Sequence, residues 1–244
     1  MRIKFDFTAQ PGTHFGVVQT LDETLNAIPG IIDMWDATAD SVTIESGRVS
    51  AWTGRRGRQF TQATPDRRPI YAADGLRMYD PATNLPAGAM ILAGAQLGAS
   101  PQMIIATRVR IAPVAANTDL QYLWAGSAPI LRIMYRETNS SNYLRANILA
   151  STGAASFDID LPETQSDIGV VLVCNGTDYA MHVAGGASAS FVGSGPADFT
   201  NLFLGTPNAG AGTLVGHQRR FGLWRHVPSA AELAAIMKWG RDPS

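Results

Sequence analysis

Arginine is the residue type in this sequence whose abundance and placement point most directly to chemistry. Among the nineteen basic residues only Lys4 and Lys238 are lysine, and the rest are arginine. A guanidinium group binds a carboxylate through two parallel hydrogen bonds and stacks on aromatic rings, which an ammonium group does less well. A GC-rich genome produces the same bias without any function, so the positions of the arginines have to decide between the two explanations.

Alternation of side chains brings several of these arginines together. In residues 130–136 and 143–150, apolar side chains alternate with polar ones, which is typical of antiparallel strands with one face on the core and one face in water. Residues 103–111 show the same pattern. We therefore expect a ligand-binding face that consists of Arg132, Arg136, Tyr143, Arg145 and Asn147, with Arg108 and Arg110 on neighbouring strands.

The chemistry of this face suits an acidic polysaccharide. Guanidinium groups would bind the carboxylates of the sugar, and the ring of Tyr143 would stack on it. Two other interpretations stay open. The N-terminal segment or a neighbouring subunit could cover the face, and arginines on exposed strands also protect sheet edges from pairing with other chains.

Acidic residues with the spacing of a glycosidase site occur once, in the segment DIDLPE from Asp158 to Glu163. A period of two would place these carboxylates on one face of a strand, as two-carboxylate hydrolysis requires. Pro162 interrupts the motif, because proline cannot donate to a central ladder. We therefore predict a strand that ends at Leu161, with Glu163 in the following loop, and no catalytic residues.

Metal and phosphate sites find little support. Asp33, Asp36 and Asp40, or Asp74 and Asp80, could contribute to a calcium site. Calcium takes six or more oxygen ligands, however, and aspartate in turns more often binds its own backbone. The four histidines lack zinc-ligand spacing, and neither a nucleophile elbow nor a phosphate loop is present. We expect no metal and no cofactor.

Composition excludes several classes of partner. The net charge is −1, so the arginines of segment 55–68 do not make the chain basic enough to favour nucleic acid. No apolar stretch approaches the length of a membrane span, and residues 1–7 lack the apolar core of a signal peptide. The single cysteine, Cys174, excludes an intramolecular disulfide and lies in an apolar run, which predicts a buried side chain.

Local patterns predict an all-β chain with one helix. Asn175-Gly176 between two apolar runs, 170–173 and 179–183, predicts a hairpin with a type I′ turn. Near the C-terminus, Ser229 and Glu232 have the spacing of a capping box, and Gly240 would end the helix. Leu233, Ile236 and Met237 would form its apolar face. We expect residues 24–30 to form a turn that ends in Pro29-Gly30.

Residues 31–71 contain an apolar strand with an aromatic residue, an Asp-rich turn, a strand at 41–45, a Ser46-Gly47 turn and a strand that ends on Trp52. This order resembles the entry segment of the concanavalin A-like lectin/glucanase jelly rolls, the laminin G-like group. The hairpin at Asn175-Gly176 and the short C-terminal helix are similar to that family as well, and the resemblance covers about residues 31–239. It implies an all-β, two-sheet antiparallel jelly-roll sandwich that binds ligands more often than it catalyses reactions.

The resemblance also implies a setting, since such domains occur in phage tail and spike proteins and in bacterial surface proteins. We divide the chain into an attachment arm, residues 1–30 with Phe5, Phe7 and Phe15, and a jelly-roll domain, residues 31–244. The expected function is that of a non-enzymatic spike, fibre or tail subunit of a virion that recognises a host-surface glycan. Expected partners are other virion proteins through the arm, an acidic polysaccharide and further copies of the chain. A glycan-free capsid or tail decoration protein is the alternative, and a glycan hydrolase is the third possibility.

Overall fold

The computed structural model describes residues 19–79, 88–93, 102–111, 121–126, 130–137, 142–150, 153–161, 167–185, 187–192, 201–205 and 214–241. For 130–137, 142–150 and most of 153–161 it describes the backbone and not the side chains. Residues 1–18, which carry Phe5, Phe7 and Phe15, lie outside the described residues.

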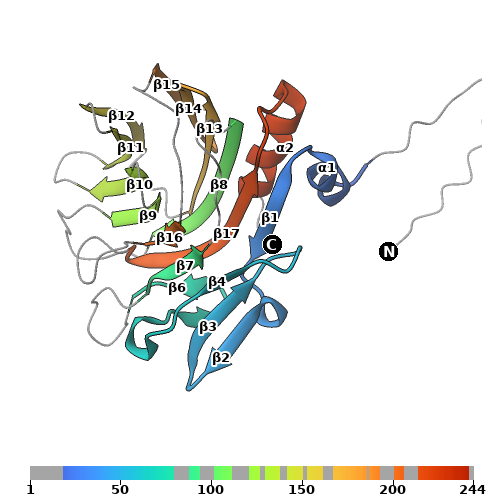
Figure 1. Ribbon diagram of the computed structural model, residues 1–244, viewed down its shortest axis with the longest axis vertical. Helices are drawn as coiled ribbons and strands as arrows, with labels where there is room; N and C mark the ends of the chain where they lie inside the picture. Colours follow the sequence, from blue (N-terminus) through green and yellow to red (C-terminus); the bar gives the residue numbers. More distant parts are fainter. Residues whose placement is uncertain are drawn as a thin grey trace, which may run out of the picture.

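Two antiparallel sheets form a sandwich, as expected (Figure 1). In the described residues, sheet A has the order β15-β14-β13-β8-β17-β6-β5, and β1 also pairs with β17. Its strands are β1 (Ile31–Asp36), β5 (Ile70–Ala72), β6 (Gly75–Arg77), β8 (Gln102–Ile111), β13 (Asp167–Asn175), β14 (Asp178–Val183), β15 (Ser188–Val192) and β17 (Gly216–Trp224).

Sheet B has the order β12-β11-β10-β9-β16-β7-β4-β3-β2 in the described residues. Its strands are β2 (Val42–Glu45), β3 (Arg48–Thr53), β4 (Gln59–Thr61), β7 (Met90–Ala93), β9 (Gln121–Gly126), β10 (Ile130–Glu137), β11 (Asn142–Ala150), β12 (Gly153–Leu161) and β16 (Asn201–Leu204). Two α-helices, α1 (Leu21–Ala27) and α2 (Ala230–Arg241), and two 3-10 turns, η1 (Ala39–Ser41) and η2 (Pro65–Arg67), complete the described elements.

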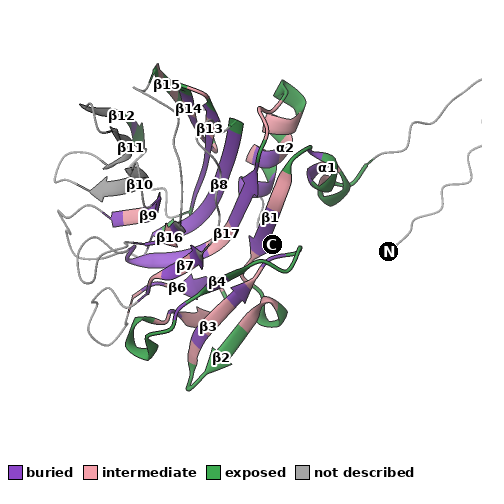
Figure 2. Ribbon diagram, in the orientation of Figure 1, coloured by how far each residue is buried: buried purple, intermediate pink, exposed green. Residues whose placement is uncertain are grey.

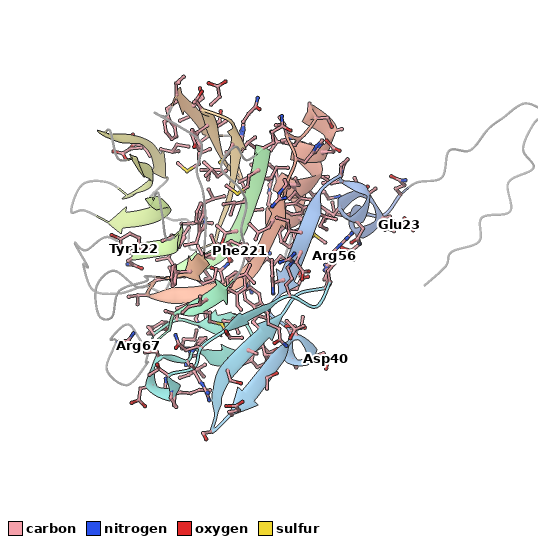
Figure 3. The ribbon with its side chains drawn as sticks, viewed as in Figure 1. Glu23, Asp40, Arg56, Arg67, Tyr122 and Phe221 are labelled. Atoms are coloured by element: carbon pink, nitrogen blue, oxygen red, sulfur yellow. The ribbon has the colours of Figure 1, made fainter. Side chains whose placement is uncertain are left out.

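The interior core lies between the sheets and takes the apolar side chains of both. Phe60 from sheet B packs edge-on against Trp35 and Phe221 from sheet A, with ring centroids 5.0 and 5.4 Å apart. Figure 3 shows Phe221 in the middle of the molecule. The indole nitrogens of Trp35 and Trp52 donate to the carbonyls of Arg58 and Asp36, so these buried rings keep their polar atoms paired.

A second core covers the other side of sheet A, which we call its outer face. Ile104 and Ala106 of β8 pack there with Trp224, and α1 and α2 contribute Leu25, Ile236 and Trp239. Figure 1 shows the two helices side by side against the sheet, and Figure 2 shows β8 and β17 buried along most of their length. The prediction that strand 103–111 has one wet face is therefore wrong for Ile104 and Ala106, which the helices cover, whereas Arg110 on the same face is exposed.

The predicted arm, residues 1–30, includes a helix that packs on the sandwich. Residues 21–27 form α1 instead of leading into a turn, and Thr20 and Glu23 close a capping box at its start. Leu25 and Ile28 are 0% and 2% exposed in the second core. Residues 19–30 thus pack on the sandwich, and an attachment role for residues 1–18 stays a prediction.

Most local predictions near the C-terminus are confirmed. β13 and β14 form the predicted hairpin, and Ser229 and Glu232 exchange the two hydrogen bonds of a capping box. The prediction of a type I′ turn is wrong, because Asn175 pairs with Asp178 and the central residues are Gly176 and Thr177, of which only Gly176 has a positive φ, +66°. Cys174 is buried, and burial raises the pKa of its thiol far above the ordinary value. Gly240 does not end the helix, which continues to Arg241. A side chain at Gly169 would collide with the carbonyl of Gly240, so glycine permits close contact between the helix and β13.

Candidate functional site

The predicted ligand-binding face lies on β10 and β11 of sheet B. Arg132 stands opposite Asn147, Arg136 opposite Tyr143, and Arg145 opposite Met134. Residues directly opposite in an antiparallel pair belong to the same face of the sheet, so the register assigns all five predicted positions to one face. Their side chains lie outside the described residues, and ligand binding there stays a prediction.

The same register adds acidic positions to this face. Asp158 of β12 stands opposite Arg145, and Asp160 stands opposite Tyr143. Both aspartates are exposed, whereas Ile159 between them is 6% exposed and belongs to the interior core. The DID alternation and the strand end at Leu161 are confirmed, and Glu163 lies outside the described residues. The spacing of these aspartates in the sequence suggests only a catalytic pair and does not show that they neighbour the predicted face.

Arg108 and Arg110 do not join that face. They belong to β8 in sheet A, whereas β10 and β11 belong to sheet B, so the expected neighbourhood of these strands is wrong. Strand alternation shows which residues share a face, but the pairing of distant strands decides which sheet each one enters. Arg108 is also buried, with 5% exposure.

Arg108 and Arg110 instead belong to a charged group on the outer face of sheet A, beyond the helices. We call it the arginine cluster, and it contains Arg77, Arg108, Arg110, Arg219, Asp74, Asp167 and His217. Register aligns Arg77 of β6 with His217 of β17, and His217 with Arg110 of β8. This alignment makes a row of three residues across three neighbouring strands.

Two aspartates neutralise part of the arginine cluster. Asp74 lies 3.5 Å from Arg110 and 3.3 Å from His217. Asp167 lies 3.1 Å from Arg219 and 3.9 Å from Arg108. Arg219 also donates from Nε to the backbone carbonyl of Asp74 at 2.9 Å, which ties the short turn between β5 and β6 to β17.

His217 sits between the two arginines of the row as a neutral imidazole. It is 7% exposed, and burial is the main reason why its pKa is lowered. Asp74 raises this pKa, while Arg77, Arg110 and Arg219 lower it further. The Nε of Arg77 lies 3.3 Å from Nε2 of His217, and an arginine can only donate, so Nε2 is the acceptor.

Tyr79 completes the surroundings of Arg77. The guanidinium carbon of Arg77 lies 5.9 Å from the centre of the Tyr79 ring, and this ring meets the His217 ring edge-on at 6.0 Å. No sequence pattern predicts this contact, because β6 spans three residues and is too short to show alternation. Arg219 was missed as well, since it lies at a register shift in β17 that breaks the period of two.

Three of the aspartates considered for calcium, Asp33, Asp36 and Asp74, bind the backbone or form ion pairs, Asp40 is exposed, and Asp80 lies outside the described residues. Asp33 is fully buried and accepts from the amides of Met34, Arg56 and Arg58 at 2.7, 2.8 and 2.9 Å. Asp36 pairs with Arg55 at 2.7 Å and with Arg220 at 3.2 Å. In the part of the chain that the structure describes, no three histidine, cysteine or acidic residues are grouped as metal ligands would be.

An open cleft of about 500 Å³ borders this ion-pair network, and Asp36, Thr38, Asp40, Ser41, Thr53, Gly54, Arg55 and Arg220 line it. Arg55 also pairs with Asp22 of α1 at 3.0 Å, so the same guanidinium connects the helix to β1.

Among the described helices, none has the length and apolar composition that a membrane-spanning helix requires.

No protein-family model and no curated protein matches the sequence. Solved structures do match the fold. Trypanosoma rangeli sialidase in complex with sialic acid aligns with 89% of this chain and 36% of its own, at a TM-score of 0.57 and 14% identity. The ligand binding domain of botulinum neurotoxin serotype D in complex with N-acetylneuraminic acid aligns with 88% of this chain and 52% of its own, at a TM-score of 0.60 and 9% identity.

A structure of botulinum neurotoxin type C, described as dependent on two ganglioside molecules for cell entry, aligns with 87% of this chain and 52% of its own, at a TM-score of 0.59 and 10% identity. This chain thus spans about a third to a half of the length of the matched chains. At such identities the likeness shows the fold alone. The fold is the concanavalin A-like jelly-roll sandwich with a C-terminal helix.

Proposed function

We propose that this chain is a non-enzymatic, lectin-like domain that binds an acidic glycan through the face of β10 and β11. The observation that carries the proposal is the register that assigns Arg132, Arg136, Tyr143, Arg145 and Asn147 to one face of a concanavalin A-like sandwich. Two of the structural neighbours are complexes with sialic acid, which bears a carboxylate. Guanidinium groups are the side chains best suited to bind such a carboxylate.

Binding measurements on single variants test this proposal. We expect Arg132→Ala and Arg145→Ala each to weaken binding of an acidic polysaccharide by about 1–3 kcal/mol, the range for hydrogen bonds to charged groups. Binding by the unaltered protein should weaken with added salt, because partly exposed ion pairs are screened. Tyr143→Ala should also weaken binding, with little effect on its salt dependence, since stacking on a neutral ring carries no net charge.

Arg67→Ala is the matched control. Arg67 is exposed on η2, and Figure 3 shows it at the edge of the molecule. Its replacement removes the same charge without touching β10 or β11. A glycan array without preference for acidic sugars, or the same affinity in Arg132→Ala, Arg145→Ala and Arg67→Ala, would contradict glycan binding at this face and favour a purely structural role.

The absence of catalysis is part of the proposal. β12 lies at the end of sheet B in the described residues, and its Asp158 and Asp160 are exposed. A retaining or inverting hydrolase holds two carboxyl groups on either side of one glycosidic bond. Release of reducing sugar from a host polysaccharide, lost in Asp160→Asn, would show that the chain is a hydrolase.

We further propose that the domain works as a spike, fibre or tail subunit of a phage or phage-like particle, where it also contacts other virion proteins and further copies of itself. The support is the resemblance of residues 31–239 to laminin G-like domains of such particles. An antibody against this chain should label purified particles from the source organism in electron micrographs. Labelled particles that do not bind glycan would instead indicate a decoration protein.

A further inference from the structure

We propose a second subsite on the outer face of sheet A, where Arg77 and Arg110 bind the carboxylate of an acidic sugar and Tyr79 supports the sugar ring. The proposal rests on the proposed glycan-binding function and adds a site that is independent of β10 and β11. The two sites belong to different sheets of the sandwich. Variants at one site can therefore be compared with variants at the other.

The row across β6, β17 and β8 places the two guanidinium groups around one position. Arg77 and Arg110 each stand directly opposite His217, and directly opposed residues are about 5 Å apart. The two arginines are therefore separated by about 10 Å at the backbone. Their side chains are long enough to converge on a carboxylate that lies above the His217 ring.

Arg77 has unused donors. Its Nε donates to His217, and its guanidinium carbon lies 5.9 Å from the centre of the Tyr79 ring. No carboxylate of the described residues lies within ion-pair distance of Arg77, whereas Arg110 is 3.5 Å from Asp74. The terminal nitrogens of Arg77 can thus form the paired hydrogen bonds that a carboxylate accepts.

Local charge favours one added anion. The arginine cluster contains four arginines, Arg77, Arg108, Arg110 and Arg219, and two aspartates, Asp74 and Asp167, so two positive charges remain without a counter-charge. His217 adds none, because burial and the nearby guanidinium groups lower its pKa. One added carboxylate would neutralise part of this charge, and the carboxylate of Asp74 already pairs with Arg110.

A buried polar atom and an aromatic ring accompany this charge. His217 is 7% exposed, and its Nδ1 has no hydrogen-bond partner among the described residues. The Tyr79 ring is half-buried beside it, and a partly exposed tyrosine ring offers an apolar face to a sugar and a hydroxyl to its polar groups. The combination of a guanidinium fork and a ring favours an acidic sugar over a simple inorganic anion.

The test titrates the full chain with N-acetylneuraminic acid and, separately, with its methyl ester, which has the same ring but no charge. Binding is followed by ligand-observed NMR. Arg145→Ala first removes the other site. In this background, we expect the added Arg77→Ala substitution to weaken binding of the acid by ten-fold or more relative to Arg145→Ala alone. Arg77→Lys should recover only part of the loss, because it restores charge without the fork. Tyr79→Ala should weaken binding of the acid as well.

Arg56→Ala serves as the control, since Arg56 is exposed and does not belong to the arginine cluster. If Arg77→Ala, Arg77→Lys and Arg56→Ala all bind the acid with the same affinity, the proposed subsite is wrong. The proposed function is unaffected by that result if the affinity for the acid still depends on Arg145. If the acid binds no better than the ester in the unaltered protein, acidic-glycan binding itself fails. Displacement of the acid by an equal concentration of sulfate would show that the site recognises charge alone and would overturn the sugar assignment.

Discussion

Replacing Asp33 by alanine removes the carboxylate that organises the loop between β3 and β4. This side chain is fully buried, and its two oxygens accept from the backbone amides of Met34, Arg56 and Arg58. The loop comes so close that a β-carbon on Gly54 would lie 2.4 Å from the Asp33 carboxylate. After the substitution, three amides would lose a charged acceptor and a cavity would form in place of the buried carboxylate.

The expected loss follows from these three hydrogen bonds. A hydrogen bond to a charged group contributes about 1.5–3 kcal/mol. The Met34 amide is buried, but the amides of Arg56 and Arg58 are partly buried and can bind water instead. We therefore expect the free energy of unfolding to fall by about 3–5 kcal/mol, which is less than the sum of three full bonds. For a domain of this size that corresponds to a decrease in Tm of about 6–20 °C.

Thermal unfolding followed by circular dichroism measures the effect, with Asp33→Asn and Asp40→Ala beside Asp33→Ala. The amide of asparagine keeps one acceptor oxygen but turns a donor toward a backbone N–H, so Asp33→Asn should show a smaller decrease. Asp40 is exposed on η1, and its loss should change the free energy of unfolding by less than about 0.5 kcal/mol.

Two results would refute this reasoning. The first is a Tm for Asp33→Ala that equals the Tm of Asp40→Ala. The second is a calcium chelator that lowers the Tm of the unaltered protein but leaves the Tm of Asp33→Asn unchanged. That outcome would mean that Asp33 holds a calcium ion and does not serve only to bind the loop backbone.

Three further predictions concern stability. Gly54→Ala should lower the free energy of unfolding by about 1–3 kcal/mol through overpacking against Asp33, and an unchanged urea midpoint would contradict that close approach. Leu25→Ala should lower the free energy of unfolding by about 2–5 kcal/mol, because Leu25 is fully buried in the second core. Deletion of residues 1–30 should lower Tm much more than deletion of residues 1–18. Equal Tm values for the two deletions would show that α1 adds nothing to the stability of the sandwich. The pKa of His217 is lower in the folded protein than its ordinary value of about 6.5, so the unfolded chain binds this proton at a higher pH than the folded protein does. Stability is therefore lost as pH falls from about 6.5 through the folded pKa. His217→Gln should therefore flatten the decrease in Tm on acidification, and parallel Tm–pH curves for both proteins would contradict this linkage.

Local patterns in the sequence determined several strands and the C-terminal helix, although they did not predict α1. The Asn175-Gly176 turn, the Ser229–Glu232 capping box and the alternation in 103–111 and 130–136 all depend on neighbours within a few residues, and each corresponds to an observed element. The pairing of Arg132 with Asn147 and of Arg136 with Tyr143 follows from the same alternation once the two strands form a hairpin. These patterns predicted an all-β chain with a C-terminal helix, and the resemblance to laminin G-like domains added the two-sheet sandwich, which the structure confirms.

The tertiary structure alone decided which faces are wet and which charges meet. Helices α1 and α2 cover one half of the outer face of sheet A, so Ile104 and Ala106 are buried although they lie on the polar side of the pattern. Arg108 and Arg110 entered a different sheet from Arg132 because β8 pairs with β13 and β17, which lie far along the chain. Arg77 and His217 are 140 residues apart and meet only through the pairing of β6 with β17. Periodicity is a property of neighbouring residues, whereas such contacts depend on which distant strands pair.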